Sequence, residues 1–291
     1  MKNKILLVFL LFLAFACLHC SPSFASVYIL NSQKNIDSRY GKIFIIIAED
    51  YALKGYYTKA KNLILKVTEF DPENIVAYSN LGVICEGLHD YKCAESSYRK
   101  ALKINPNNMV INYYLGLILD KSGKNAESLK YLAKAAELMP YDAIIYYDIA
   151  IIFARNNKHE QSIYYNQKSV ELKPDFAEAY NNLCYSMASI NKYNEALPMC
   201  QKAFELKPQS ASILDSLGYV YFGLNDVGKS VDYYKKAISI DPNISEVYLH
   251  LAQAYQKLGE NQKAAEFYKK YIQLEPDAKN IKEIKLILKN W

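Results

Sequence analysis

Seven prolines recur every 34 residues, and this spacing constrains the fold of the chain more than any other feature. No insertion or deletion interrupts the period, which includes seven of the nine prolines in the sequence. A fixed period of this length is typical of repeat architectures, in which each repeat is one small unit of secondary structure. The set is Pro72, Pro106, Pro140, Pro174, Pro208, Pro242 and Pro276.

The phase of the prolines predicts seven units, and other columns of the repeat agree with it. The units are residues 41–74, 75–108, 109–142, 143–176, 177–210, 211–244 and 245–278. One column is always aliphatic: Ile47, Leu81, Leu115, Ile149, Leu183, Leu217 and Leu251. The next column is always small: Ala48, Gly82, Gly116, Ala150, Cys184, Gly218 and Ala252. Small residues allow two helices to approach closely, so we expect this column at a helix–helix contact.

Each unit contains two helical stripes, because its apolar residues recur at intervals of three and four. Residues that break helices lie between the stripes: Gly55, Gly87, Gly123, Asn157, Asn191, Asn225 and Gly259. The proline ends the second stripe, since it cannot continue the hydrogen-bond ladder of a helix. The sequence therefore predicts an all-α chain of seven helix–turn–helix hairpins.

The pattern aromatic-xx-Leu-Gly-xx-Tyr, then Ala-xxx-aromatic, then Pro resembles the tetratricopeptide repeat over residues 41–278. The resemblance implies an α-α superhelix, or solenoid, of stacked hairpins. Two units depart from the pattern. Asn112 replaces the first aromatic residue of its unit, and Asn166 and Ser169 stand where an aromatic residue and an alanine are usual.

The last residues, 279–291, are predicted to form a capping helix. Ile281, Ile284, Ile287 and Leu288 make one apolar stripe, and lysines occupy the rest of the helix. A terminal capping helix needs an apolar face that packs on the last repeat and a polar face that is exposed to solvent.

The N-terminus is typical of a signal peptide. Lys2 and Lys4 precede an apolar run of fourteen residues, 5–18, which is short for a membrane span of about 20 residues. Small residues at Ser23 and Ala25 predict cleavage after Ala25, which divides the N-terminus into a signal peptide, 1–25, and a leader, 26–40. We therefore expect an exported protein of the periplasm or cell envelope, with no membrane span in the mature chain.

Two alternatives remain for this segment. Acylation of Cys17 would make the protein a membrane-anchored lipoprotein, although Ala14, Phe15 and Ala16 depart from the pattern before such cysteines. An uncleaved anchor is disfavoured by the length of the apolar run. Cleavage after Ala25 leaves 33 basic and 30 acidic residues, a balance that does not favour nucleic acid as a partner.

The sequence predicts no catalytic residue, no cofactor and no metal site. Residues 223–230 match the phosphate-binding pattern GxxxxGK[ST], but that loop functions between a strand and a helix, and here it spans a hairpin turn. His89, His159 and His250 are interpreted as solvated surface residues, since none has a partner at metal-ligand spacing. We therefore expect a protein that is not an enzyme.

Four cysteines of the predicted mature chain form two pairs within hairpins. Cys184 and Cys200 occupy columns that should face each other, and Cys85 and Cys93 lie on the two helices of the second hairpin. Both pairs are candidate disulfides in an oxidising compartment. The alternative is a buried free thiol, which packs as a small apolar residue.

The resemblance implies that first-helix residues not used in packing line a concave groove that binds a protein or an extended peptide. The candidate groove residues are Val110, Tyr113, Tyr114, Leu117, Ile144, Tyr147, Ile151, Asn181, Tyr185, Tyr219 and Phe222. Exposed apolar residues of this size suggest a partner anchor, and the alternative is that several pack between hairpins. The lysine and asparagine clamp of chaperone-binding members is absent from these positions.

The function we expect is a non-catalytic scaffold for assembling a complex in the periplasm or cell envelope. This expectation rests on the predicted fold and on the predicted export of the protein. The alternative is an accessory module of a glycosyltransferase or polysaccharide export system, since Asn181 and Asn182 beside Tyr185 would suit a sugar.

Overall fold

The computed structural model describes residues 38–291, which form fifteen helices and no strand. These residues belong to two compact units, one ending at Ser122 and the other beginning at Gly123. The all-α prediction of consecutive helical hairpins followed by a terminal helix is confirmed. The signal peptide and most of the predicted leader lie outside the described residues.

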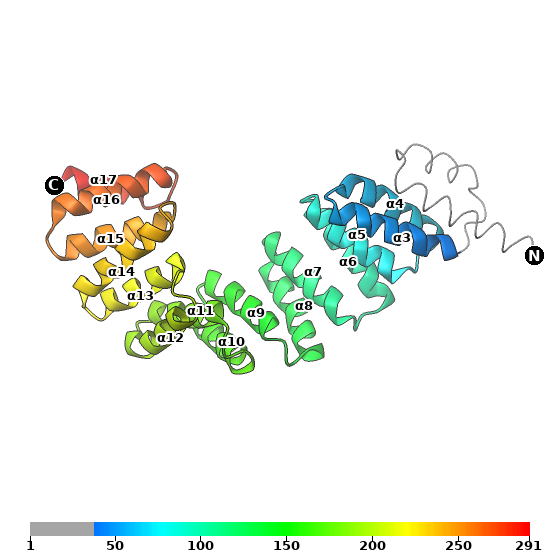
Figure 1. Cartoon of the computed structure of the whole chain (residues 1–291), viewed down its shortest axis with the longest axis horizontal. Coiled ribbons are helices and arrows are strands. Elements are labelled where there is room, and N and C mark those ends of the chain that lie inside the picture. Colours follow the sequence, from blue (N-terminus) through cyan, green and yellow to red (C-terminus); the bar gives the residue numbers. More distant parts are fainter. Residues whose placement is uncertain (1–37) are drawn as a thin grey trace, which may run out of the picture. The chain divides into compact units, whose positions relative to one another are not determined.

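The first unit is a stack of helices in which each helix packs against the next one in the chain (Figure 1). Its helices are α3 (Ser38–Leu53), α4 (Tyr57–Phe70), α5 (Ile75–Gly87), α6 (Tyr91–Ile104) and α7 (Met109–Lys121). Helix α3 begins at Ser38, inside the segment assigned to the leader, so the first hairpin is longer than its repeat.

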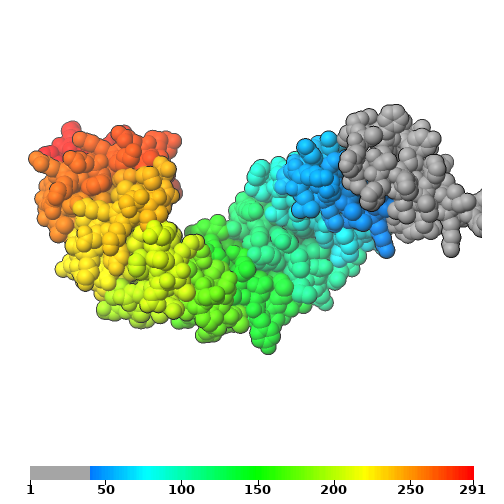
Figure 2. Space-filling view, in the orientation of Figure 1, coloured from blue at the N-terminus to red at the C-terminus, as the bar shows by residue number. Residues whose placement is uncertain are grey.

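The second unit continues the same pattern. Its helices are α8 (Asn125–Leu138), α9 (Ala143–Arg155), α10 (His159–Leu172), α11 (Ala177–Ser189), α12 (Tyr193–Leu206), α13 (Ala211–Gly223), α14 (Val227–Ile240), α15 (Ser245–Lys257), α16 (Asn261–Leu274) and α17 (Ile281–Lys289). The colours of these helices follow one another in sequence order in the space-filling view, because each hairpin lies against its neighbours in the chain (Figure 2). Within residues 38–291, every helix is too short or too polar to cross a membrane.

The turn inside each hairpin uses one residue with a left-handed backbone. These residues are Gly55, His89, Gly123, Asn157, Asn191, Asn225 and Gly259, again at intervals of 34. Glycine and asparagine tolerate this conformation best, which explains most of the column. The expectation that Gly87 breaks the second hairpin is wrong, because Gly87 belongs to α5 and His89, with a φ of 56°, makes the turn.

Gly87 has a packing role instead. A Cβ at this position would overlap with the ring of Tyr57 in the preceding hairpin, so only glycine permits the contact. The small column predicted from the sequence works in the same way. Gly82 and Gly218 leave room for the buried rings of Tyr98 and Tyr234, which lie on the second helix of the same hairpin.

The units that depart from the repeat pattern replace apolar packing by hydrogen bonds. Tyr146 and Tyr248 donate their hydroxyl groups to the carbonyls of Pro140 and Pro242. Asn112 occupies the equivalent column, and its Nδ2 donates to the carbonyl of Pro106 at 3.0 Å. The shorter side chain therefore keeps the hydrogen bond that links the first helix to the preceding loop.

In the fourth hairpin the substituted residues form a buried polar seam. Asn166 donates to the carbonyl of Ser162, Ser162 and Ser186 share a hydrogen bond of 2.8 Å, and Ser169 donates to the carbonyl of Ala143. All four side chains are buried. Because buried polar groups need partners, this seam holds α9, α10 and α11 in register.

Candidate functional site

The candidate groove residues of the second unit lie on the first helices of consecutive hairpins, α9, α11 and α13, and none of them is buried. Tyr185 and Ile144 are the most exposed, at 47% and 46%. The others are half-buried: Tyr147, Ile151, Asn181, Tyr219 and Phe222. The structure therefore places an exposed aromatic and aliphatic surface on these helices, in agreement with their assignment to a wall outside the core.

Aromatic contacts join this surface from one hairpin to the next. The ring centroids of Tyr185 and Tyr219 are 6.2 Å apart, and those of Tyr219 and His250 are 5.6 Å apart. Because these residues come from α11, α13 and α15, the row crosses three hairpins. We call Tyr185, Tyr219 and His250 the aromatic row.

Tyr147 also packs against the loop that precedes α11, with its ring centroid 4.8 Å from that of Phe176. Burial raises the pKa of the Tyr147 and Tyr219 hydroxyls, and nearby carboxylates or tyrosines add to the shift. Both tyrosines therefore stay neutral at ordinary pH. Tyr147 and Tyr219 thus take part in packing, whereas Tyr185 and Ile144 keep nearly half of their surface exposed.

One end of the aromatic row carries an ion pair that the sequence interpretation missed. The Nδ1 atom of His250 lies 2.8 Å from the Oδ1 atom of Asp215, and both side chains are about one-fifth exposed. The interpretation of His250 as a solvated surface residue is therefore wrong. The repeat offered a signal, since Asp215 and His250 are 35 residues apart and so lie on neighbouring first helices.

Burial alone would lower the pKa of the His250 imidazole, because it penalises the charged form. The charge of Asp215 and the hydrogen bond to it outweigh this effect, and Glu246 adds a smaller contribution. The net result is a pKa above the usual value of histidine. The positively charged form of His250 is thus favoured next to the row, relative to a free histidine.

The groove residues of the first unit lie on α7. Val110 and Tyr114 are exposed, and Tyr113 and Leu117 are half-buried. The ring of Tyr114 stacks on that of Tyr98 with centroids 6.1 Å apart. Val76, which is exposed on α5 and stands one repeat before Val110, was missed, although the period of 34 would have found it.

The residues that match GxxxxGK[ST] have structural roles. Gly223 ends α13 and gives room to the ring of Tyr193, and Ser230 is buried in α14, where it donates to the carbonyl of Val227. Lys229 pairs with Asp226 at 2.8 Å. The match therefore lies between two helices, which is not the strand–loop–helix context of a phosphate-binding loop.

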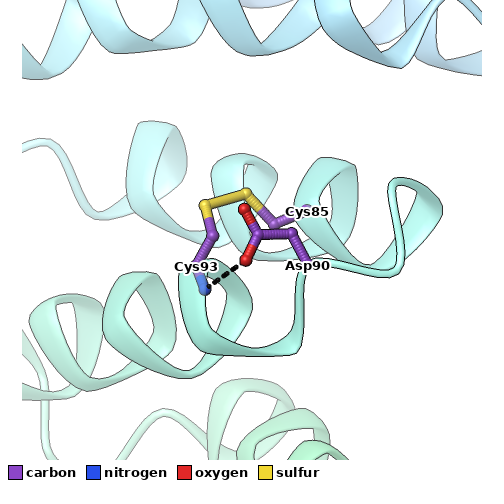
Figure 3. A group of neighbouring side chains, drawn as sticks. All are labelled: Cys85, Asp90 and Cys93. Atoms are coloured by element: carbon purple, nitrogen blue, oxygen red, sulfur yellow. Dashed lines mark hydrogen bonds between the residues drawn. A yellow bond between two sulfur atoms is a disulfide. The ribbon is translucent and has the colours of Figure 1, made fainter.

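Both candidate cysteine pairs are joined as disulfides in the structure, Cys85 to Cys93 and Cys184 to Cys200. Asp90 lies beside the first bond, at the turn between α5 and α6 (Figure 3). Its carboxylate accepts a hydrogen bond from the backbone N–H of Cys93, which lowers its pKa, and it also pairs with Lys61. A bonded pair of sulfurs offers no thiolate, so this cluster is a helix cap next to a crosslink.

Models of the tetratricopeptide repeat match four parts of the chain. The matched residues are 75–108, 97–130 and 245–278, and a TPR repeat model matches 218–259. No curated protein matches the sequence.

Several solved structures share the fold at low sequence identity. A protein from Parabacteroides merdae, described as a tetratricopeptide repeat protein, is 16% identical with a TM-score of 0.68, over 86% of this chain and 98% of that one. YrrB, described as a TPR protein with an unusual peptide-binding site, is 21% identical with a TM-score of 0.56, over 65% and 97%. MamA is 24% identical with a TM-score of 0.54, over 60% and 96%.

Proposed function

This chain is a tetratricopeptide repeat protein, and from that premise we propose that it is a non-catalytic scaffold that binds a protein or an extended peptide. Proteins of this family are generally scaffolds without catalytic activity, and the relative YrrB is described as having a peptide-binding site. The proposal assigns binding to the exposed faces of the first helices. Sequence identities below 25% to the solved structures support a shared fold and not a shared partner.

The observation that carries the proposal is the exposed surface around the aromatic row. Tyr185 and Ile144 are large side chains that are nearly half exposed, and they stand on helices that bury six or more other residues in the core. Tyrosine offers a large contact area at a low cost in conformational entropy and also carries a polar end. Such side chains are enriched among the residues that dominate the free energy of protein binding.

A site-specific photocrosslinker at position 185 tests the proposal in the native cells. We expect it to capture one predominant partner, because Tyr185 faces outward from α11. The matched control is the same crosslinker at Tyr164, which is 51% exposed but lies on α10, a second helix. Equal capture from both positions would contradict the assignment of binding to the first helices. Capture of a polysaccharide at Tyr185 would instead favour the accessory module of an export system.

A substitution gives a second measurement at the same site. Tyr185→Ala should weaken capture of the partner by about tenfold or more, as expected for an aromatic anchor. The same change should leave the melting temperature almost unaltered, since about half of the side chain is exposed. Tyr147→Ala is less suitable, because the loss of its contact with Phe176 would also lower stability.

We also propose that the protein is exported to the periplasm or cell envelope and serves the assembly of a complex there. The basic and apolar N-terminal sequence supports export. The two disulfides also support it, because disulfides persist mainly in oxidising compartments. A soluble product cleaved after Ala25 and a lipoprotein anchored at Cys17 are the two forms of this proposal.

Mass spectrometry of protein purified from its native cells separates these outcomes. The proposal expects an N-terminus at Ser26 and no alkylation of Cys85, Cys93, Cys184 and Cys200 until a reductant is added. A lipid-modified N-terminal Cys17 would identify the lipoprotein form. Retention of Met1 together with four reactive thiols would overturn the proposal of export.

A further inference from the structure

The loop before α9 differs in chemistry from the other six loops that contain a repeat proline. Six prolines are preceded by polar or charged residues: Asp71, Asn105, Lys173, Lys207, Asp241 and Glu275. The same six are followed by polar or charged residues: Glu73, Asn107, Asp175, Gln209, Asn243 and Asp277. Pro140 alone has apolar neighbours of both kinds, Met139 before it and Tyr141 after it.

The fold does not explain this exception. Tyr141 is 86% exposed, so its ring contributes little to the core, and the six other loops adopt the same connection with polar residues. A large aromatic side chain that is exposed to solvent, close to a methionine, indicates a contact with a binding partner. Methionine suits such a contact because its side chain adapts to the shape of a partner.

An open hollow of about 700 Å³ lies at this loop. It is lined by Met139, Tyr141 and Ile144 and by Leu172 and Lys173 at the end of α10. Ile144 also belongs to the groove residues, so the hollow adjoins the proposed binding surface. Its size is within the range of about 300–1,000 Å³ that is typical of ligand sites, enough for one bulky side chain and its neighbours.

Two charged side chains line the hollow, the cation of Lys173 and the carboxylate of Asp142. The Nζ atom of Lys173 lies over the ring of Phe176, 4.7 Å from its centroid, and no carboxylate among the described residues forms an ion pair with it. Asp142 also lines the hollow, but its carboxylate accepts a hydrogen bond from the backbone N–H of Ile144 and caps α9. The carboxylate of Asp142 is thus held at the N-terminus of α9, where the helix dipole offsets part of its charge. Lys173 has no carboxylate of the described residues within ion-pair distance, and the charge of Glu178 acts on it from further away.

We infer that this hollow is an anchor pocket for an extended segment of the partner protein in which a bulky apolar side chain stands next to a carboxylate. The apolar side chain fills the space between Met139, Tyr141 and Leu172, and the carboxylate pairs with Lys173. This inference rests on the proposed function, because it takes the occupant to be the same partner that contacts the first helices. It adds the chemistry that the partner must present.

The pocket is tested on the mature chain with 13C-labelled methionine methyl groups and short peptides blocked at both ends. Phe-Asp, Phe-Lys and Ala-Asp in a Gly-Ser background serve as probes. We expect Phe-Asp to shift the methyl signal of Met139 while Met187 and Met199 report no change. Phe-Lys should bind about threefold more weakly, which is the size of an exposed charge pair, and Ala-Asp should have no effect.

Variants separate the pocket from nonspecific contact. Tyr141→Asn gives the loop a residue that two other loops carry, so it should abolish the shift without loss of helicity. Lys173→Glu should reverse the preference between Phe-Asp and Phe-Lys. Asn243→Ala, at the equivalent position of another loop, is the matched control and should leave all shifts unchanged.

Several outcomes would overturn the inference. These are equal binding of Phe-Asp and Phe-Lys, a shift that survives Tyr141→Asn, and no shift with any peptide. A Met139 shift that follows protein concentration without peptide would make a second copy of the chain the occupant and also overturn it. Partner capture at Tyr185 without a response at Met139 would leave the proposed function standing and remove the pocket alone.

Discussion

Gly218 has no side chain because the ring of Tyr234 occupies the space next to it. The two residues lie on the facing helices of one hairpin, and Tyr234 is fully buried. In other hairpins the same two columns hold other combinations, such as Ala48 with Ile64. At Gly218 and Tyr234, the absence of a side chain on one helix makes room for the large ring on the other, as expected of a close-packed interior.

Replacing Gly218 by alanine should therefore destabilise the protein. The new Cβ would overlap with the buried Tyr234 ring, and we expect the free energy of unfolding to fall by about 1–3 kcal/mol. Gly228→Ala is the control, because a Cβ there meets nothing within 4 Å and should raise stability by up to about 1 kcal/mol. Urea unfolding followed by circular dichroism measures both, and equal effects would contradict the packing argument.

The ion pair of His250 and Asp215 makes stability depend on pH. Because the pKa of His250 is raised in the folded chain, its stabilising effect is complete below the unfolded pKa of about 6.5. The effect is lost as the pH rises through the folded pKa. Asp215→Asn should thus cost about 1 kcal/mol near pH 6 and less near pH 9.

Urea unfolding of the wild type, Asp215→Asn and His250→Gln at both pH values provides the measurement. The three proteins should differ most near pH 6, and their stabilities should converge as the pH rises. A constant difference between the wild type and Asp215→Asn at the two pH values would show that the charge on His250 plays no part. Glu246 contributes to the same shift and remains in all three proteins.

At the scale of elements, α17 ends the second unit in the way predicted for a cap. Ile281 and Ile284 are buried, whereas Leu286 is 61% exposed on the opposite face. Tyr271 of α16 donates its hydroxyl to Asn280, just before the helix begins. The hairpin of α15 and α16 is thus covered by one short helix.

Shortening a buried side chain of this cap should loosen the last hairpin. Ile284→Ala should lower the free energy of unfolding of that region by about 2 kcal/mol, since it removes buried apolar contacts. Leu286→Ala should change it by no more than about 0.5 kcal/mol. Hydrogen exchange should show faster opening of α16 in the first variant only. Uniform loss of protection throughout the second unit would contradict a local role.

At the scale of the whole molecule, stability comes from contacts between neighbouring hairpins. Within each of the two units, the frequent helix contacts join a helix to the next one in the chain or to the equivalent helix of the adjoining hairpin. Repeat proteins with such contacts unfold as a sum of local units and nearest-neighbour interfaces. A single cooperative transition is therefore not expected of the full chain.

Trp291, the only tryptophan, allows a direct test of this expectation. Its ring lies 6.1 Å from that of Tyr268 and reports on the C-terminal hairpin. In urea, tryptophan fluorescence should change at a lower concentration than circular dichroism, which averages all helices. Ile284→Ala should widen the gap between the two midpoints. Coincident transitions in both proteins would show that the chain unfolds as one unit.

The sequence by itself determined the hairpins, their number and the columns that pack between their helices. The period of 34 and the intervals of three and four residues are properties of the sequence pattern. They set where each helix begins and ends, and which face of it, with its small residues, packs against the partner helix. The same period also placed Tyr185 and Ile144 on first helices outside the core.

Only the tertiary structure decided how polar residues find partners across the repeats. Asn112 departs from the repeat pattern, and its side chain donates to the Pro106 carbonyl. His250 was expected in solvent, yet it pairs with Asp215. These contacts depend on the tilt between neighbouring helices and on side-chain rotamers, which a pattern of hydrophobic residues does not encode. The sequence therefore specifies the repeating framework, and the packing of one hairpin on the next sets the chemistry of its surface.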